Sequence, residues 1–193
     1  MKFLIPWHRY GLIAELASEL QGKSPQFGKT SLQKMVYLLQ TACKVDVGYE
    51  FDLYTYGPFS SQLLQDLDMV ESLGGVQVRP VLSRLNGYRI DPADRNQVLR
   101  DRAKDFLSRP EVTEALRRLI KDLGHCSARD LELRSTIVYV FHDVGSSGHT
   151  DRNKVIQLVN EIKPKFSRQE IVDAVEELEA KRYIAFAPQA VSS

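Results

Sequence analysis

Apolar residues recur at helical spacing through most of the chain. Between residues 7 and 20 they stand three and four positions apart, which predicts an amphipathic helix. The run at 137–141 is apolar on every side, so we expect the helix that contains it to be central and buried. The same reasoning predicts further helices at 30–43, 60–73, 92–107, 110–123, 127–142, 151–162 and 168–180.

Pairs of polar residues mark two helix starts. Thr30 with Gln33, and Ser167 with Glu170, have the spacing of a capping box. In that motif each side chain bonds to the backbone N–H of the other residue, which satisfies two donors that the first helical turn leaves free. The sequence therefore predicts that helices begin directly after Thr30 and Ser167.

Short segments between the helices have strand patterns. Residues 49–56 alternate between two faces, as in a half-buried strand. Residues 76–82 and 88–90 flank Asn86-Gly87, a pair typical of a hairpin turn. These patterns predict one isolated strand and one β-hairpin in the first half of the chain.

The order helix, helix, helix, strand occurs twice, which is the layout of a winged helix. We therefore predict a mainly α (α+β) fold of winged-helix-like units with a small antiparallel sheet, the β-hairpin serving as the first wing. A strand at 183–187 would be the second wing. The units are predicted at residues 1–91 and 127–193, with connecting helices at 92–126. A single helical domain with a small sheet is the alternative.

Composition and charge narrow the classes of function. The chain has 193 residues and a formal net charge of +1, so it lacks the overall basic excess of many nucleic-acid-binding proteins. Its two cysteines do not form a secreted disulfide framework. The sequence contains no apolar stretch long enough to cross a bilayer. We expect a cytoplasmic protein that does not bind membranes.

Two glycine-containing segments resemble catalytic loops without matching them. Residues 28–30, Gly-Lys-Thr, end like a phosphate-binding loop, but the upstream glycine is one position too far away and a helix precedes the segment. The loop at 143–150 has the wrong spacing for a nucleophile elbow. His142 and His149 at this loop leave a metal site open, although their spacing fits no recognised ligand set. We predict no enzyme active site and no cofactor.

The third helix of each predicted unit is acidic. Residues 60–73 carry Asp66, Asp68 and Glu71 and neither lysine nor arginine, and residues 168–180 carry five carboxylates and one arginine. Such helices would repel the phosphates of a DNA duplex. Acidic recognition helices therefore favour a protein partner.

The predicted hairpin carries the opposite charge. Arg79, Arg84 and Arg89 all lie in or beside its arms. A wing of this kind contacts phosphate in some winged-helix proteins. The alternative function is therefore a DNA-binding transcriptional regulator that uses this hairpin.

Two segments carry a family resemblance. Residues 29–40, Lys-Thr-Ser-Leu-Gln-Lys-Met-Val-Tyr-Leu-Leu-Gln, resemble the Leu-Gln-Lys-Leu-x-Tyr signature of the SocA/Panacea-type antitoxin superfamily. Residues 49–60, with the core Phe-x-x-Tyr-x-Tyr-Gly-Pro-Phe-Ser, more closely resemble the YwgA-like bacterial family. The resemblance covers about residues 8–90 and leaves a long second half outside it. It implies a bacterial protein that neutralises toxins by direct binding, with no catalytic residue carried over.

These lines of reasoning predict a non-enzymatic protein-interaction module, antitoxin-like or adaptor, which is open to homodimer formation. The candidate contact residues are Tyr54, Tyr56, Asp66, Asp68 and Glu71. Tyr54 and Tyr56 also have a structural interpretation, in which the segment turns the chain and packs its rings beneath the helix at 30–43.

Overall fold

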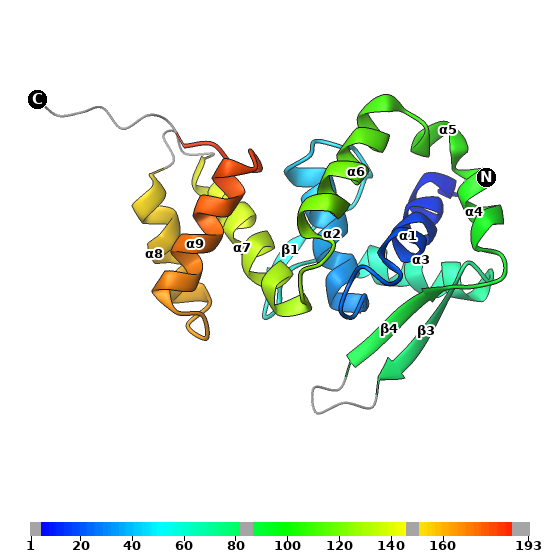
Figure 1. Ribbon diagram of the computed structural model, residues 1–193, viewed down its shortest axis with the longest axis horizontal. Coiled ribbons are helices and arrows are strands. Elements are labelled where there is room, and N and C mark those ends of the chain that lie inside the picture. The colour runs from blue at the N-terminus through cyan, green and yellow to red at the C-terminus, as the bar shows by residue number, and fades with distance from the viewer. Residues whose placement is uncertain (1–4, 82–86, 146–150, 187–193) are drawn as a thin grey trace, which may run out of the picture.

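The computed structural model of the protein describes residues 5–81, 87–145 and 151–186. Helices account for most of these residues, and two antiparallel sheets of two strands each accompany them (Figure 1). The predicted mainly α, α+β fold class is therefore confirmed. The first half contains α1 (Trp7–Leu20), α2 (Lys29–Thr41), β1 (Asp52–Tyr54), β2 (Gly57–Phe59), α3 (Ser61–Ser72), β3 (Val76–Val81) and β4 (Gly87–Pro92). The second half contains α4 (Asn96–Arg102), α5 (Lys104–Leu107), α6 (Pro110–Leu123), α7 (Ala128–Gly145), α8 (Arg152–Ile162) and α9 (Arg168–Ala180).

The buried apolar residues form one continuous core that extends from α1 to α9. Helices α2 and α7 pack against each other in its middle, with α8 and α9 on one side and α1, α3 and α4 on the other (Figure 1). Ile137 and Val138 of α7 are fully buried, which confirms that this helix is central. The two predicted winged-helix-like units and the helices that connect them thus share one hydrophobic interior.

Serine and acidic side chains begin two helices as capping theory predicts. Ser167 Oγ accepts a bond from the Glu170 backbone N–H at 3.2 Å, and a Glu170 carboxylate oxygen accepts one from the Ser167 N–H at 2.7 Å. Ser127 and Asp130 make the same reciprocal pair before α7, at 3.2 and 3.1 Å. The capping box at Ser167 is confirmed.

The capping box predicted at Thr30 is wrong. Helix α2 begins two residues earlier, at Lys29, and its N-cap residue Gly28 has no side chain to bond the first turn. The Gln33 amide instead points into the core, where it bonds the backbone of Ser60. The amide satisfies the buried N–H and C=O of Ser60, whereas water can satisfy the N–H groups at the solvated end of the helix.

The strand predicted at 49–56 is shorter than expected and has a partner of its own. β1 pairs with β2 from Asp52↔Phe59 to Tyr54↔Gly57, so this segment forms a small hairpin. The longer hairpin of β3 and β4 is confirmed, with a register from Val76↔Pro92 to Val81↔Gly87.

The strand predicted at 183–187 is absent from residues 183–186, and residue 187 lies outside the described part. The Tyr183 N–H bonds Leu178 O and closes the end of α9, and Arg182 has a φ of 57°. This left-handed residue turns the chain back onto the helix, where Tyr183 and Ile184 are buried. The winged-helix assignment stays a prediction.

Helix length bears on the question of a membrane span. Helix α7 has 18 residues but includes Arg129, Asp130, Glu132 and Arg134. Across the residues that the structure describes, we find no helix whose length and hydropathy suit a transmembrane segment.

Candidate functional site: an anchored tyrosine hairpin

The β1–β2 hairpin displays two tyrosines. Tyr54 and Tyr56 are each 62% exposed. The interpretation that their rings pack beneath α2 is therefore wrong. Phe51 takes that place, with its ring centre 5.2 Å from the ring of Tyr37 in α2. The tyrosines are thus available to a partner.

Side chains of helix α2 form hydrogen bonds with the backbone of this hairpin. Lys34, which is 2% exposed, donates a hydrogen bond from Nζ to Pro58 O at 2.7 Å. The preceding residue acts in the same way: the Gln33 amide donates to Ser60 O at 2.8 Å and accepts from the Ser60 N–H at 2.9 Å. These bonds satisfy buried peptide groups that a strand of three residues cannot pair by itself.

The second half of the chain supplies another anchor. Lys163 donates from Nζ to Thr55 O and forms an ion pair with Glu132 at 2.9 Å. The side chains of Lys163 and Glu132 are each 4% exposed. Lys165 lies 2.7 Å from the other carboxylate oxygen of Glu132. A buried charge of this kind is tolerated because its partner and a backbone carbonyl satisfy it.

Gly57 fits the hairpin closely onto α7. Its φ is +88°, a left-handed conformation that residues with a Cβ rarely adopt. A Cβ at this position would lie 3.0 Å from Thr136 Oγ1 and 3.3 Å from Ser135 Oγ. Both conformation and space therefore favour glycine at the turn.

Burial changes the proton affinity of Lys34. Its removal from water lowers the pKa to about 8, while the charge of Glu132 acts to raise it and that of Lys163 to lower it. Buried ionisable groups with shifted pKa values gather at functional sites and also in structural networks. The bond to Pro58 O gives Lys34 a structural role in holding the hairpin.

A groove of about 300 Å³ opens beside the tyrosines. Its lining combines aromatic and apolar side chains with two lysines and contains no carboxylate among the residues that form it. Lys29, at one edge, also lies 4.4 Å from the ring centre of Tyr88. The lining includes Lys29, Thr30, Lys34, Tyr54, Tyr56, Phe59 and Leu64.

The prediction that Asp66 is a contact residue is wrong, because its side chain is buried. Asp66 is 3% exposed and accepts hydrogen bonds from Tyr49 Oη at 2.8 Å and Gln62 Nε2 at 3.1 Å. Arg9 Nε lies 3.0 Å from the same carboxylate. Burial, with the neighbouring Asp66 charge, raises the pKa of Tyr49. Asp66 therefore joins α1, α3 and the Tyr49 segment.

The other acidic candidates on α3 differ from each other. Asp68 is exposed. Glu71 is half-buried and accepts a hydrogen bond from the Val78 N–H at 2.7 Å, which ties α3 to β3. Among the three carboxylates predicted on α3, Asp68 alone faces solvent freely.

Helix α9 does not present a bare acidic face either, since arginines and lysines from neighbouring segments neutralise much of it. The hydrogen bond from Arg129, with further bonds from Ser167, lowers the pKa of Glu170 to about 2. The prediction of an acidic surface on this helix did not take these cationic partners into account. The ion pairs are Glu170–Arg129, Glu176–Arg152, Glu179–Arg152, Glu177–Arg134 and Glu177–Lys181.

The structure brings two of the hairpin arginines together. Arg79 and Arg89 stand directly opposite each other on β3 and β4, and both are exposed. Arg79 also forms an ion pair with Asp91 at 2.9 Å. Arg84 lies outside the described residues.

The histidine loop contributes little to the site. His149 lies outside the described residues, and burial lowers the pKa of His142. Within residues 5–81, 87–145 and 151–186, no three metal-ligating side chains come together.

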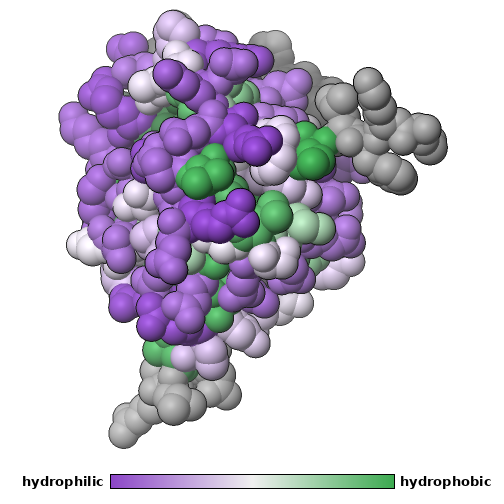
Figure 2. Space-filling model, turned by 90° about the vertical axis from the view of Figure 1, so that its right-hand side faces the viewer, coloured by the Kyte–Doolittle hydropathy of each residue, from purple (hydrophilic) through white to green (hydrophobic). Residues whose placement is uncertain are grey.

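Another face of the molecule lacks the apolar character of a large interface. The surface at the α4 side is mostly hydrophilic, with small separate apolar spots (Figure 2). A stable interface usually requires a larger continuous apolar centre. This side therefore offers no large apolar centre for a stable interface.

Sequence reasoning missed the buried charged residues that anchor the hairpin. Lys34 and Glu132 have an ordinary helical context in the sequence, and Lys163 directly follows the helix predicted at 151–162. One signal was present for Glu132, since it lies one turn before the all-apolar run of α7. A carboxylate on a central helix requires a buried cation, but the sequence does not say which lysine supplies it.

Comparison with known proteins adds no family. No protein-family model matches the chain, and no curated protein matches it. The resemblance to the YwgA-like family therefore stays a prediction from residues 29–40 and 49–60. These two segments meet in space, because Lys34 of the first bonds Pro58 of the second.

Proposed function

We propose that the protein is a non-enzymatic protein-interaction module of the bacterial cytoplasm, antitoxin-like or adaptor, that binds its partner through the β1–β2 hairpin. One observation carries this proposal. Tyr54 and Tyr56 are largely exposed on a backbone that buried side chains hold in place. An isolated exposed tyrosine needs no explanation, but two on one anchored turn form a small aromatic surface.

The energetics of protein interfaces support this role. Tyrosine is enriched among residues that dominate binding energy, because it combines a large apolar ring with a polar end. A backbone fixed before binding loses less conformational entropy when the complex forms. The bonds from Lys34, Gln33 and Lys163 provide such preorganisation.

The groove beside the tyrosines indicates the character of the partner surface. Lys29 and Lys34 line it, and no carboxylate does. A partner that inserts an acidic side chain next to an apolar one would match this lining. The groove takes the place of Asp66, which is buried, among the predicted contacts with the partner.

The test begins with the full chain as bait in its native host and identification of the protein that binds it. The affinity of that purified partner is then measured for the wild type and for the double variant Tyr54→Ala, Tyr56→Ala. Loss of two interface tyrosines should weaken binding by about 30-fold or more. If the identified partner is a toxin, the same variant should fail to neutralise it.

A matched control is Met69→Ala, since Met69 is a large side chain, 45% exposed, on α3. This variant should bind like the wild type. Equal binding by the double tyrosine variant, with its fold intact by circular dichroism, would reject the hairpin as the binding surface.

A second candidate is DNA binding through the β3–β4 hairpin. Its support is the direct opposition of Arg79 and Arg89, because like charges across a ladder repel unless an anion lies between them. Duplex binding should then weaken steeply with salt. Arg84→Ala with Arg89→Ala should lower both the affinity and the slope of that salt dependence.

A further inference from the structure

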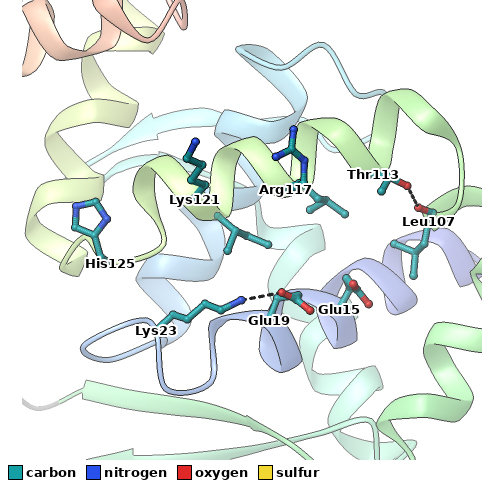
Figure 3. Close-up of a pocket in the computed structure, with 10 residues that line it drawn as sticks. Glu15, Glu19, Lys23, Leu107, Thr113, Arg117, Lys121 and His125 are labelled. Carbon is teal, nitrogen blue, oxygen red and sulfur yellow. Dashed lines mark hydrogen bonds and ion pairs between the residues drawn. The ribbon is translucent and has the colours of Figure 1, made fainter.

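A different cavity, of about 590 Å³, lies between α1 and α6 and shares no lining residue with the hairpin groove. Figure 3 shows the residues that line it, among them Glu15 and Glu19 on α1 and Arg117 and Lys121 on α6. His125 lies at one end and Leu107 at the other. We call this cavity the α1–α6 groove.

Apolar side chains give the groove a hydrophobic surface. Leu107, Leu116 and Ile120 all line it. Its volume falls within the range of about 300–1,000 Å³ that is usual for small-molecule sites. The groove is therefore large enough for an elongated ligand with an apolar body.

The carboxylates of the groove already have partners. Glu15 forms an ion pair with Arg100, and Glu19 forms one with Lys23 at 2.9 Å. Because the two carboxylates on α1 are already paired with cations of the protein, they would attract a cationic ligand only weakly. Arg117 is likewise paired with Glu114, at 2.7 Å.

Lys121 and His125 differ from the other charged or ionisable side chains of the groove. Both are exposed, and neither has an ion pair or hydrogen bond within the described part of the chain. They stand four residues apart, at the end of α6 and just after it. The groove thus has free hydrogen-bond donors and free positive charge toward the end where His125 lies.

We propose that the α1–α6 groove binds a small amphiphilic anion. Its apolar body lies along Leu107, Leu116 and Ile120, and its carboxylate or phosphate head accepts hydrogen bonds from Lys121 and His125. The paired carboxylates of α1 disfavour a second negative charge, so the ligand carries one anionic head. This site is independent of the tyrosine hairpin and of its partner.

Four probes with the same apolar body and different heads test the proposal on the full chain. These are octanoate, octyl phosphate, octanol and octyltrimethylammonium, each titrated below its micelle concentration. Isothermal titration calorimetry gives affinity, and NMR shifts of the Ile120 methyl groups report the place of binding. We expect saturable binding of one or both anions with shifts at Ile120. Whichever of the two anions binds with the higher affinity shows whether the natural ligand carries a carboxylate or a phosphate head.

Variants separate the head contact from general hydrophobic binding. Lys121→Gln should weaken binding of the preferred anion by about fivefold, and adding His125→Gln should weaken it further. Lys154→Gln is the matched control, because Lys154 is exposed on α8 and does not line this groove. All three substitutions are at exposed positions, and the far-UV spectrum verifies the folding of each variant.

Several results would overturn the proposal. Octanol or octyltrimethylammonium could bind as tightly as the anions, or neither anion could shift the Ile120 methyl groups at millimolar concentration. An equal loss of affinity in the Lys154→Gln variant would also exclude Lys121 as the specific contact.

Discussion

The two hairpins of this protein are stabilised in different ways. β3 and β4 pair over six residues each, and a few further bonds, among them one from the Ile90 N–H to Phe27 O at 2.8 Å, join them to neighbouring segments. β1 and β2 have three residues each and depend on side chains from distant segments. Lys34 and Lys163 bond carbonyls of this short hairpin, and Lys163 depends in turn on Glu132.

The long hairpin is stabilised mainly by local hydrogen bonds between its strands, and the short hairpin by contacts with residues far away in the sequence. A two-stranded hairpin is marginal in water, so a short one needs outside support. Six pairs of residues give β3–β4 most of its hydrogen bonds from its own ladder, whereas β1–β2 uses buried ammonium groups. The short hairpin should therefore be far more sensitive to loss of a distant charge.

The largest expected effect comes from Glu132→Ala. This change leaves the ammonium of Lys163 buried without its partner, and breaking a buried ion pair in this way costs about 3–5 kcal/mol. Urea unfolding should show the loss in the free energy of unfolding. Lys165→Gln removes the other partner of the same carboxylate, but its side chain is 47% exposed, so we expect a cost below about 1 kcal/mol. Equal costs for the two variants would contradict the importance of burial.

A smaller effect should appear in the pH dependence of stability. The pKa of Lys34 is about 8 in the folded protein, below its ordinary value of 10.5. Between these values the unfolded chain binds more protons, so the free energy of unfolding should rise with pH. The contribution is about 2 kcal/mol from about pH 8 to about pH 9.5. From around the ordinary thiol pKa of 9.0 the raised pKa values of Cys43 and Cys126 act in the opposite direction, and at higher pH those of buried tyrosines do the same.

Comparison with Lys34→Met isolates this contribution, because the thiols and tyrosines are unchanged. Denaturant unfolding at several pH values should show that the free energy of unfolding of the wild type, minus that of the variant, rises with pH across this window. Lys154→Met, at an exposed position on α8, should keep the wild-type slope. An unchanged slope in Lys34→Met would show that Lys34 titrates normally.

The fit of the short hairpin onto α7 gives a still smaller effect. Gly57→Ala should destabilise the protein by about 1 kcal/mol more than Gly48→Ala. Both glycines have positive φ, +88° and +81°, but a Cβ at Gly48 would meet no atom within 4 Å. Thermal or urea unfolding of the two variants separates the packing cost from the shared backbone strain. Equal losses would mean that Thr136 and Ser135 move aside freely.

The long hairpin should respond least. Arg89→Thr removes the repulsion from Arg79 and should stabilise the protein by about 0.5 kcal/mol. Gln77→Thr, on the same hairpin face, controls for the strand preference of threonine. If Arg89→Thr gains no more than this control in urea unfolding, the Asp91 partner of Arg79 already cancels the repulsion.

Much of the helical fold could be predicted from the sequence, because each helix has a local periodicity. The all-apolar run at 137–141 indicated a central helix, and Ser167 with Glu170 marked the start of α9. The long hairpin followed from Asn86-Gly87 between two strand patterns. In each case residues close together in the chain carried the information.

The candidate site could be predicted in part. Tyr54 and Tyr56 were named from the sequence, but Asp66 was named with them and proved to be buried. Asp66 is buried because it pairs with Arg9 and Tyr49, which belong to other segments. The spacing of residues along α3 therefore could not predict its burial. The pairing of Lys163 with Glu132 likewise depends on how α7 and the loop after α8 pack, which local patterns do not encode.

The contact between Lys163 and Thr55 spans 108 positions of the chain. During synthesis on the ribosome the tyrosine turn emerges first, and the lysine that fixes it emerges 108 residues later. Contacts of such sequence separation form late, because a long loop must close first. Until then the turn lacks one of its two lysine anchors, so a nascent or truncated chain would display its tyrosines without a complete frame.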